Sequence, residues 1–233
     1  MSSEIKGSID ANADDDHSAF NPLSKVSLAD SVFIALNKRT AYSLSKMPKI
    51  TGSGIYALYY TGAFEPYGRL AQCNAHHRHR LPIYIGKADP PGKRKGAAGD
   101  ELKTSTSLAN RLRIHKRSIE SASNLEIEDF AVRFLVVDVS FIGLCESLLI
   151  GRLTPLWNTT IDGLGNNPPG KGRTGQVQSR WDTLHPGRTW AKTLPMRSET
   201  FATICSEVKQ VLRDNTLVSA TLAECRAEGR GAD

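Results

Sequence analysis

Two short stretches rich in aromatic and β-branched residues constrain the fold of this chain more than any other feature. They are residues 54–60 (GIYALYY) and residues 83–87 (IYIGK), and glycine or proline precedes each of them. This pattern predicts two β-strands. Because side chains alternate along a strand, Tyr56 and Leu58 are expected on one face. Ile55, Ala57 and Tyr59 are expected on the other face. Core packing alone would account for these tyrosines, so other residues must decide whether they have a chemical role.

The length and composition indicate a soluble globular protein with one main domain. The chain has 233 residues, of which 39% are hydrophobic and 23% charged, and this is enough to bury a core. It has no apolar run near the roughly 18 residues that a membrane span needs, and its polar, acidic start is unlike a signal peptide. We therefore expect no membrane partner. The four cysteines show no paired spacing, which favours a reducing, cytoplasmic location.

Charge is distributed unevenly along the chain. The net charge is +6; residues 60–120 hold twelve Lys and Arg against five Asp and Glu, and residues 163–197 hold six against one. Residues 1–24 instead carry one basic and five acidic side chains. Two basic segments predict a surface that binds a polyanion such as nucleic acid, with an ordinary solvated surface as the alternative.

Hydrophobic periodicity predicts the remaining elements and the domain boundaries. We expect strands at about 53–60, 83–87 and 129–137, and helices at 28–39, 107–121 (capped by Ser107), 141–153 and 199–213. The expected organisation is a disordered tail at 1–24, one domain at 25–195, and a C-terminal helix and tail at 196–233, loosely held beyond 216.

The segment between the first two strands, residues 61–81, is too long for a tight hairpin and is expected to be a loop. It mixes hydrogen-bonding side chains with Arg69, Arg78 and Arg80, which suits contacts to base edges and phosphates. A zinc site is the alternative, but its candidate ligands are bunched without a second distant pair. Those candidates are Cys73, His76, His77 and His79.

Two further segments are basic and rich in glycine and proline. Residues 87–104 lack the Lys-Ser/Thr ending of a Walker phosphate loop, so we expect a clamp on a nucleic-acid backbone. Residues 162–195 are expected to contact the backbone in the same way. The cations assigned to these contacts are Lys93, Arg94, Lys95, Lys171, Arg173 and Arg188, with Lys87 as a lesser candidate.

Three polar residues stand out on the expected helices. His115 lies in an apolar stripe, where histidine is typically a core residue, but Arg111 borders the same stripe one turn earlier. Glu146 is the only charged residue between Asp138 and Arg152. A carboxylate in such surroundings needs a partner, and either a salt bridge to an arginine or a metal ion would supply one.

The ordered set Gly54-Ile55-Tyr56, Tyr84-Ile85-Gly86, Arg111, His115, Glu146 and Asn158 resembles the GIY-YIG nuclease family. This resemblance covers about residues 50–160. The later stretches GNNPPGKGR and WDTLHPGR look like the type II restriction endonucleases of the family and extend it to about residue 195. The 27 residues at 57–83 between the triplets exceed the gap in most family members.

The resemblance implies an α+β domain in which helices flank a three-stranded antiparallel sheet, with extensions that grip DNA. It also implies hydrolysis of DNA with one Mg²⁺, for which Mn²⁺ would substitute. In the implied mechanism Glu146 holds the ion and Tyr56 positions or deprotonates the attacking water. The proton of Tyr56 passes to His115 or, as the alternative, to a metal-bound group. Arg111 then holds the scissile phosphate, Tyr84 bonds to the water or phosphate, and Asn158 supports the site through its amide.

The same resemblance implies the partners. These are double-stranded DNA with a palindromic site, GC-rich as in CCGCGG, a second copy of the chain, and a methyltransferase that protects the host site. A tetramer is the alternative to the homodimer. The other functional interpretations are a homing or repair nuclease of the superfamily and a DNA-binding protein without catalysis. Only 75 residues follow Asn158, which is short for the appended modules of a homing enzyme.

Overall fold

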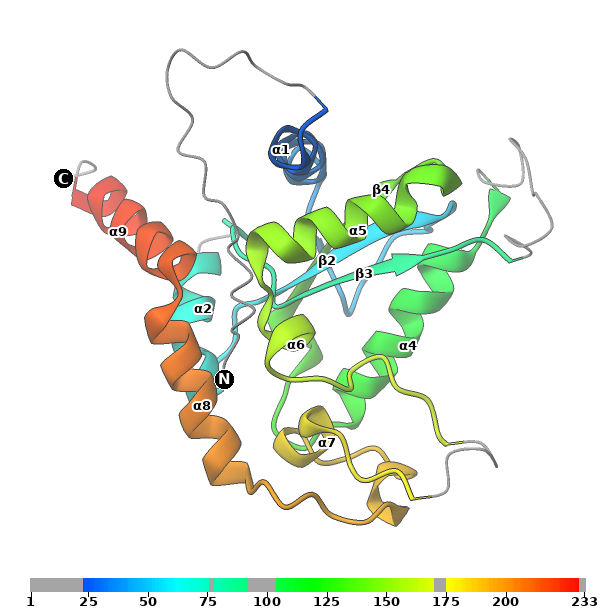
Figure 1. Cartoon of the computed structure of the whole chain (residues 1–233), viewed down its shortest axis with the longest axis vertical. Helices are drawn as coiled ribbons and strands as arrows, with labels where there is room; N and C mark the ends of the chain where they lie inside the picture. Colours follow the sequence, from blue (N-terminus) through cyan, green and yellow to red (C-terminus); the bar gives the residue numbers. More distant parts are fainter. Residues whose placement is uncertain (1–22, 76–77, 92–103, 170–174, 231–233) are drawn as a thin grey trace, which may run out of the picture.

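A computed structural model describes residues 23–75, 78–91, 104–169 and 175–230. Helices cover both faces of an antiparallel sheet (Figure 1). The strands are β1 (Tyr42–Ser43), β2 (Gly54–Tyr60), β3 (Tyr84–Ala88) and β4 (Phe130–Val136). The α-helices are α1 (Lys25–Asn37), α2 (Gly68–Asn74), α4 (Ser107–Ser121), α5 (Val139–Leu153), α6 (Leu156–Thr159), α7 (Arg180–Leu184), α8 (Phe201–Asp214) and α9 (Thr216–Arg230). Short 3₁₀ turns are η1 (Glu65–Tyr67), η3 (Ile127–Asp129) and η5 (Ala191–Thr193).

The sheet has four strands in the order β1-β4-β2-β3, and every neighbouring pair is antiparallel. The α+β class and the three expected strands are confirmed, but the expected strand count is wrong because β1 adds a fourth strand beside β4. With only two residues, β1 has no periodicity that a sequence pattern can reveal. The arrangement leaves β3 as an edge strand, so one side of its backbone is open to other groups.

The central strand β2 is buried along its whole length and divides the core into two clusters. Tyr56 and Leu58 pack in the larger cluster with residues of α4, whereas Ile55 and Ala57 pack with residues of α1 and α5. The expected alternation along this strand is therefore confirmed. Figure 1 shows α4 and α5 on opposite faces of the sheet.

Glycines in the two triplets permit close approach. A Cβ on Gly54 would collide with the carbonyl oxygen of Leu135 on the neighbouring strand, and one on Gly86 would collide with the Tyr56 hydroxyl. Only glycine leaves room for the backbone in the first case and for the phenol in the second.

The predicted helices are confirmed, with small shifts at their ends. The expected cap at Ser107 is wrong: Ser107 is the first residue of α4, and Thr106 occupies the cap position without a side-chain hydrogen bond. Helix α5 begins two residues earlier than expected because Asp138 caps it, accepting a hydrogen bond from Ser140 N at 2.9 Å. No helix within the described ranges is long and apolar enough to cross a membrane.

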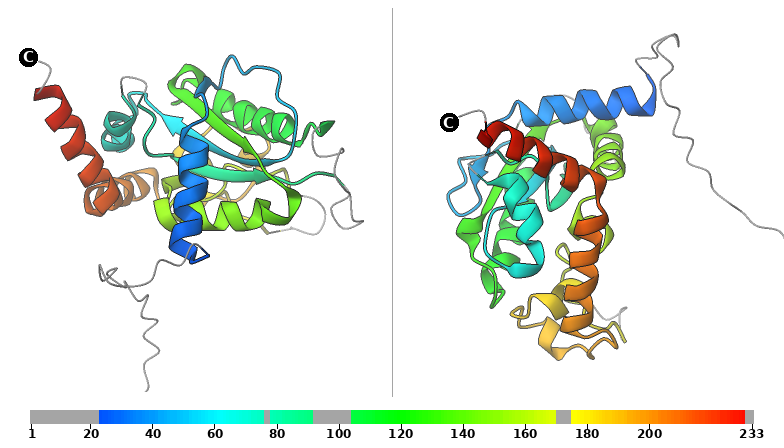
Figure 2. Two further views of the ribbon diagram at one scale, coloured as in Figure 1. Left: turned by 90° about the horizontal axis from the view of Figure 1, so that it is seen from above. Right: turned by 90° about the vertical axis from the view of Figure 1, so that its left-hand side faces the viewer.

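Two segments differ from expectation because they pack on each other. Residues 61–81 are not an open loop but contain η1 and α2, and residues 217–230 are not loose but belong to α9. Buried side chains of α2 meet Val218 and Leu222 of α9, and the Cys73 thiol donates to Val218 O at 3.7 Å. Figure 2 shows α8 and α9 along the side of the molecule that carries α2. Of the tail expected at 1–24, residues 1–22 lie outside the described residues, and Ser24 caps α1.

Candidate active site

Four of the predicted site residues meet on the α4 face of the sheet. The hydroxyl of Tyr56 lies 2.6 Å from His115 Nε2. The Tyr84 ring lies 5.2 Å from the His115 ring and 6.2 Å from the Tyr56 ring, measured between centroids. Arg111, one turn before His115 on α4, completes the group. Strands β2 and β3 and helix α4 thus bring together residues that are up to 59 positions apart in the sequence.

Burial keeps the Tyr56–His115 pair neutral. Burial raises the pKa of Tyr56 well above its usual value, and the nearby Tyr84 raises it further. Burial also lowers the pKa of His115 to about 3, with the charges of Arg111 and Arg188 acting in the same direction. The proton therefore stays on the phenol near neutral pH, and the Nε2 lone pair accepts it as a hydrogen bond. His115 Nδ1 has no hydrogen-bond partner among the described residues.

The Arg111 guanidinium is half-buried beside both tyrosine hydroxyls. Burial raises the pKa of Tyr84, and the positive charge of Arg111 opposes this effect. None of the carboxylates in the described part of the chain forms an ion pair with Arg111. A permanently charged fork with this environment suits a phosphate.

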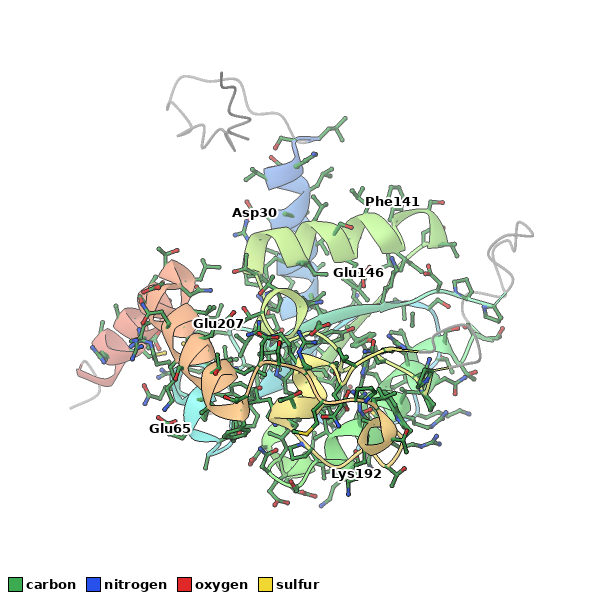
Figure 3. The ribbon with its side chains drawn as sticks, turned by 60° about the horizontal axis from the view of Figure 1, so that its bottom comes forward. Asp30, Glu65, Phe141, Glu146, Lys192 and Glu207 are labelled. Carbon is green, nitrogen blue, oxygen red and sulfur yellow. The ribbon has the colours of Figure 1, made fainter. Side chains whose placement is uncertain are left out.

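Glu146 approaches the same edge of the sheet from the other face. Its Oε2 lies 2.8 Å from Lys87 Nζ, with the two side chains 19% and 39% exposed. The partner of this carboxylate is therefore a lysine and not the arginine considered from the sequence. Hydrogen bonding to Glu146 raises the pKa of Lys87, and the charge of Glu146 also raises the pKa of Tyr84. Figure 3 shows Glu146 on the side of α5 toward the sheet.

Asn158 occupies the open side of β3. Its Oδ1 accepts from Ile85 N at 2.8 Å, and its Nδ2 donates to Ile85 O at 2.8 Å. The amide thus replaces a neighbouring strand at this point and holds the backbone between Tyr84 and Gly86. Asn158 therefore contacts the β3 backbone through its amide, and its support of catalysis stays a prediction.

The three arginines of residues 61–81 contact the C-terminal helices. Arg69 Nε donates to Leu212 O at 3.1 Å, and Arg78 lies 3.3 Å from Glu228. Arg80 pairs with both Glu224 and Glu228 at 2.7 Å. A contact from Arg78 or Arg80 to DNA would have to replace these ion pairs, and the DNA-reading role of this segment stays a prediction.

The remaining residues expected to contact DNA are either buried or lie outside the described residues. Arg188 is only 5% exposed and pairs with Asp182 at 2.7 Å, so its charge is used inside the protein. Lys93, Arg94, Lys95, Lys171 and Arg173 lie outside the described residues.

The alternative zinc site gains no support. His76 and His77 lie outside the described residues, and Cys73 and His79 are buried. No group of three or more potential ligands occurs in the described part of the chain.

A second buried tyrosine–histidine pair was not foreseen. Tyr67 Oη lies 2.6 Å from His185 Nε2, and Trp157 Nε1 donates to the same hydroxyl at 2.9 Å. Asn124 Oδ1 lies 2.9 Å from His185 Nδ1. Every polar atom of this imidazole is thus paired, and burial lowers the pKa of His185 to about 3. This pair links the end of α7 to η1 inside the core. The WDTLHPGR stretch therefore has a structural role.

The antiparallel sheet with helices on both faces makes this a small α+β domain. A family model described as the Eco29kI GIY-YIG domain matches residues 48–212, and the chain belongs to this family of restriction endonucleases. The match extends past the expected domain boundary at 195 and through most of α8. It makes the chain a DNA endonuclease. A search of curated proteins found no match.

Proposed function

We propose that this protein is a type II restriction endonuclease that hydrolyses both strands of a palindromic duplex site and leaves 5′-phosphate and 3′-hydroxyl ends. The observation that supports this proposal most is the arrangement around the β3 edge. Tyr56, His115, Arg111 and Tyr84 lie on one side of this strand, and Glu146 reaches it from the other. A phosphodiester at this edge would meet Arg111 and Tyr84, which are partly exposed, and Glu146, with the buried Tyr56–His115 pair behind them.

The residues on the α4 face have roles in proton transfer and charge stabilisation. Tyr56 takes a proton from the attacking water while its own proton passes to His115 Nε2 along the existing 2.6 Å hydrogen bond. The raised pKa of Tyr56 and the lowered pKa of His115 disfavour an ionised pair at rest. Both proton transfers, from the water to Tyr56 and from Tyr56 to His115, therefore occur together with the attack of the water on the phosphate. Arg111 binds the scissile phosphate, and Tyr84 donates to the water or to a phosphate oxygen.

The residues fit a single divalent cation. Glu146 already holds a cationic group, the ammonium of Lys87, and the described residues offer no cluster of three ligands. One protein carboxylate suits Mg²⁺, which keeps several waters and binds substrate phosphates; Mn²⁺ is expected to replace it. Such an ion would offset the charge that develops on the leaving 3′ oxygen. Lys87 would then be released to pair with a phosphate.

The proposed assembly follows from the number of catalytic sets. One chain carries one set, whereas the strands of a duplex are antiparallel and both must be cut. A homodimer whose two-fold axis matches a palindrome meets this need most simply, and a tetramer is the alternative. The family resemblance supports a GC-rich site of the CCGCGG kind and a companion methyltransferase. The basic segments 87–104 and 162–195 would contact the DNA backbone.

The test is cleavage of phage or plasmid DNA by the purified protein with Mg²⁺. Discrete fragments with 5′-phosphate ends are expected, and sequencing the ends reveals the site. Prior methylation of that site should protect it. A smear, or fragments that also arise with the Glu146→Gln variant, would contradict the proposal.

A further inference from the structure

Gly165, in the segment of residues 163–166, lies against the Arg111 side chain. A Cβ on Gly165 would lie 2.7 Å from Arg111 Nη2 and 3.7 Å from Tyr84 Oη. Gly165 does not have a left-handed φ, unlike Gly163 with a φ of +116°. Its backbone conformation is therefore open to other residues, and what glycine provides here is space for the guanidinium.

This segment is held from behind by Arg188. Arg188 Nη2 donates to Gly163 O at 2.9 Å, and Nη1 donates to Leu164 O at 3.2 Å and to Asn166 O at 3.4 Å. A planar guanidinium presents its donors in a fixed geometry, so it can hold three carbonyl groups of one segment at once. Leu164, which is 1% exposed, anchors the segment in the core.

The surroundings of Arg188 are built to keep it in place. Its Nε lies 2.7 Å from Asp182 Oδ1, and Asp182 is 4% exposed. Its guanidinium carbon lies 4.6 Å from the Trp181 ring centroid and 4.7 Å from that of Trp190. The two ring contacts and the ion pair with a buried carboxylate restrict the Arg188 side chain to this conformation. It is too enclosed to contact DNA directly, which was its expected role.

We propose that Arg188 is a positioning residue for DNA cleavage: it holds residues 163–166 as a wall that fixes the Arg111 guanidinium beside Tyr56 and Tyr84. This inference rests on the proposed role of Arg111 as the phosphate ligand. The wall limits how far the guanidinium can retreat from the β3 edge. Gly165 sets that limit, and Arg188 with Asp182 keeps the wall from moving.

The first experiment is a double-mutant cycle between Gly165→Ala and Arg111→Lys. The added methyl group meets the end of a flexible side chain, so it should displace Arg111 at little cost to folding. A displacement of this size lowers single-turnover cleavage by about a hundredfold. In the Arg111→Lys background, which lacks the Nη2 atom, the same substitution should cost less than about threefold. Gly151→Ala is the control, because a Cβ there meets nothing within 4 Å.

The outcomes separate this inference from the proposed function. If Arg111→Lys cleaves like the wild type, the phosphate role of Arg111 fails. If Arg111→Lys is impaired but Gly165→Ala has equal effects in both backgrounds, or no effect in the wild type, the wall does not act through Arg111 and the inference is overturned.

The second experiment tests Arg188 itself. Arg188→Lys keeps a charge beside Asp182 but loses the fork, so the single-turnover rate at saturating DNA should fall about tenfold while the Kd for DNA is unchanged. Arg180→Lys is the matched control, since Arg180 also donates to a backbone carbonyl, Thr160 O at 2.6 Å, and pairs with Glu207. If the cleavage rates of both variants fall equally, and each fall follows the drop in thermal midpoint, Arg188 only stabilises the fold. That result would overturn the proposal.

Discussion

The hydroxyl of Tyr56 and Nε2 of His115 lie 2.6 Å apart, and both side chains are fully buried. The same distance separates Tyr67 Oη from His185 Nε2 elsewhere in the core. Only the first pair lies beside Arg111 and the open strand β3. The chain therefore contains a candidate catalytic pair and a structural pair of the same chemistry, and each serves as the control for the other.

Tyr56→Phe should lower single-turnover cleavage at least about a hundredfold, because it removes the group that takes the proton of the water. The ring and its packing against Tyr84 and His115 remain, but His115 Nε2 loses its buried hydrogen-bond partner, so stability should fall by about 1–3 kcal/mol and the rate must be measured below the thermal midpoint. Tyr67→Phe should lower stability for the same reason, by about 1–3 kcal/mol, because it leaves Trp157 Nε1 and His185 Nε2 without their partner. Its cleavage rate below the thermal midpoint should be normal. Equal rate losses in the two variants would contradict the assignment.

Stability should fall in mild acid because His115 and His185 both have a folded-state pKa of about 3 against a usual 6.5. Above pH 6.5 both are neutral in the folded and unfolded states. Below it the unfolded chain binds protons that the folded chain does not, so stability is lost as pH falls toward 3. Each histidine contributes a slope of at most about 1.4 kcal/mol per pH unit.

Urea unfolding at pH 7 and pH 5 measures this effect. His185→Gln should roughly halve the difference between the two conditions, even if it lowers stability at both. An unfolding free energy that does not change over this range would show that the histidines are not held neutral.

Lys87→Met should strengthen metal binding in the absence of DNA. The Lys87 ammonium lies 2.8 Å from Glu146 Oε2 and would compete for the oxygen that the proposed cation needs. Calorimetric titration with Mn²⁺ should give a several-fold lower Kd for the variant than for the wild type, and Glu146→Gln should abolish binding. An unchanged Kd in Lys87→Met would mean that the ion pair and the metal use different groups.

Much of the fold could be predicted because local patterns carry it. Alternation along residues 54–60 identified strand β2, and helical periodicity identified α4, with only its capping residue misplaced by one position. The two-residue strand β1 is too short for any period. Helices α2 and α9 are stabilised by packing on each other, through Cys73 and Val218 among others, and such a partner is not visible in either segment alone.

Only part of the candidate site could be predicted from the sequence. The family spacing brought Tyr56, His115 and Arg111 together, but the partner of Glu146 depends on which side chain of β3 points toward α5. Charge counts along the chain placed Arg188 among the DNA contacts. Such counts say how many cations a segment has and nothing of their burial, so the ion pair between Arg188 and Asp182 required the structure.

The protein should bind a specific duplex as a homodimer. Light scattering or sedimentation on a palindromic duplex, using the Glu146→Gln chain to prevent cleavage, should give two protomers per site. Four would favour the tetramer. One protomer per duplex at saturating protein would defeat the two-fold model and favour an asymmetric nuclease.

We predict that DNA cleavage depends on a divalent cation held by Glu146. The most direct measurement is single-turnover cleavage of a specific duplex by the wild type and Glu146→Gln with Mg²⁺, alongside DNA binding by both. Glutamine keeps the volume but removes the charge, so we predict no detectable cleavage by the variant and DNA binding at least as tight as that of the wild type. Cleavage by Glu146→Gln at the wild-type rate would contradict this role of Glu146.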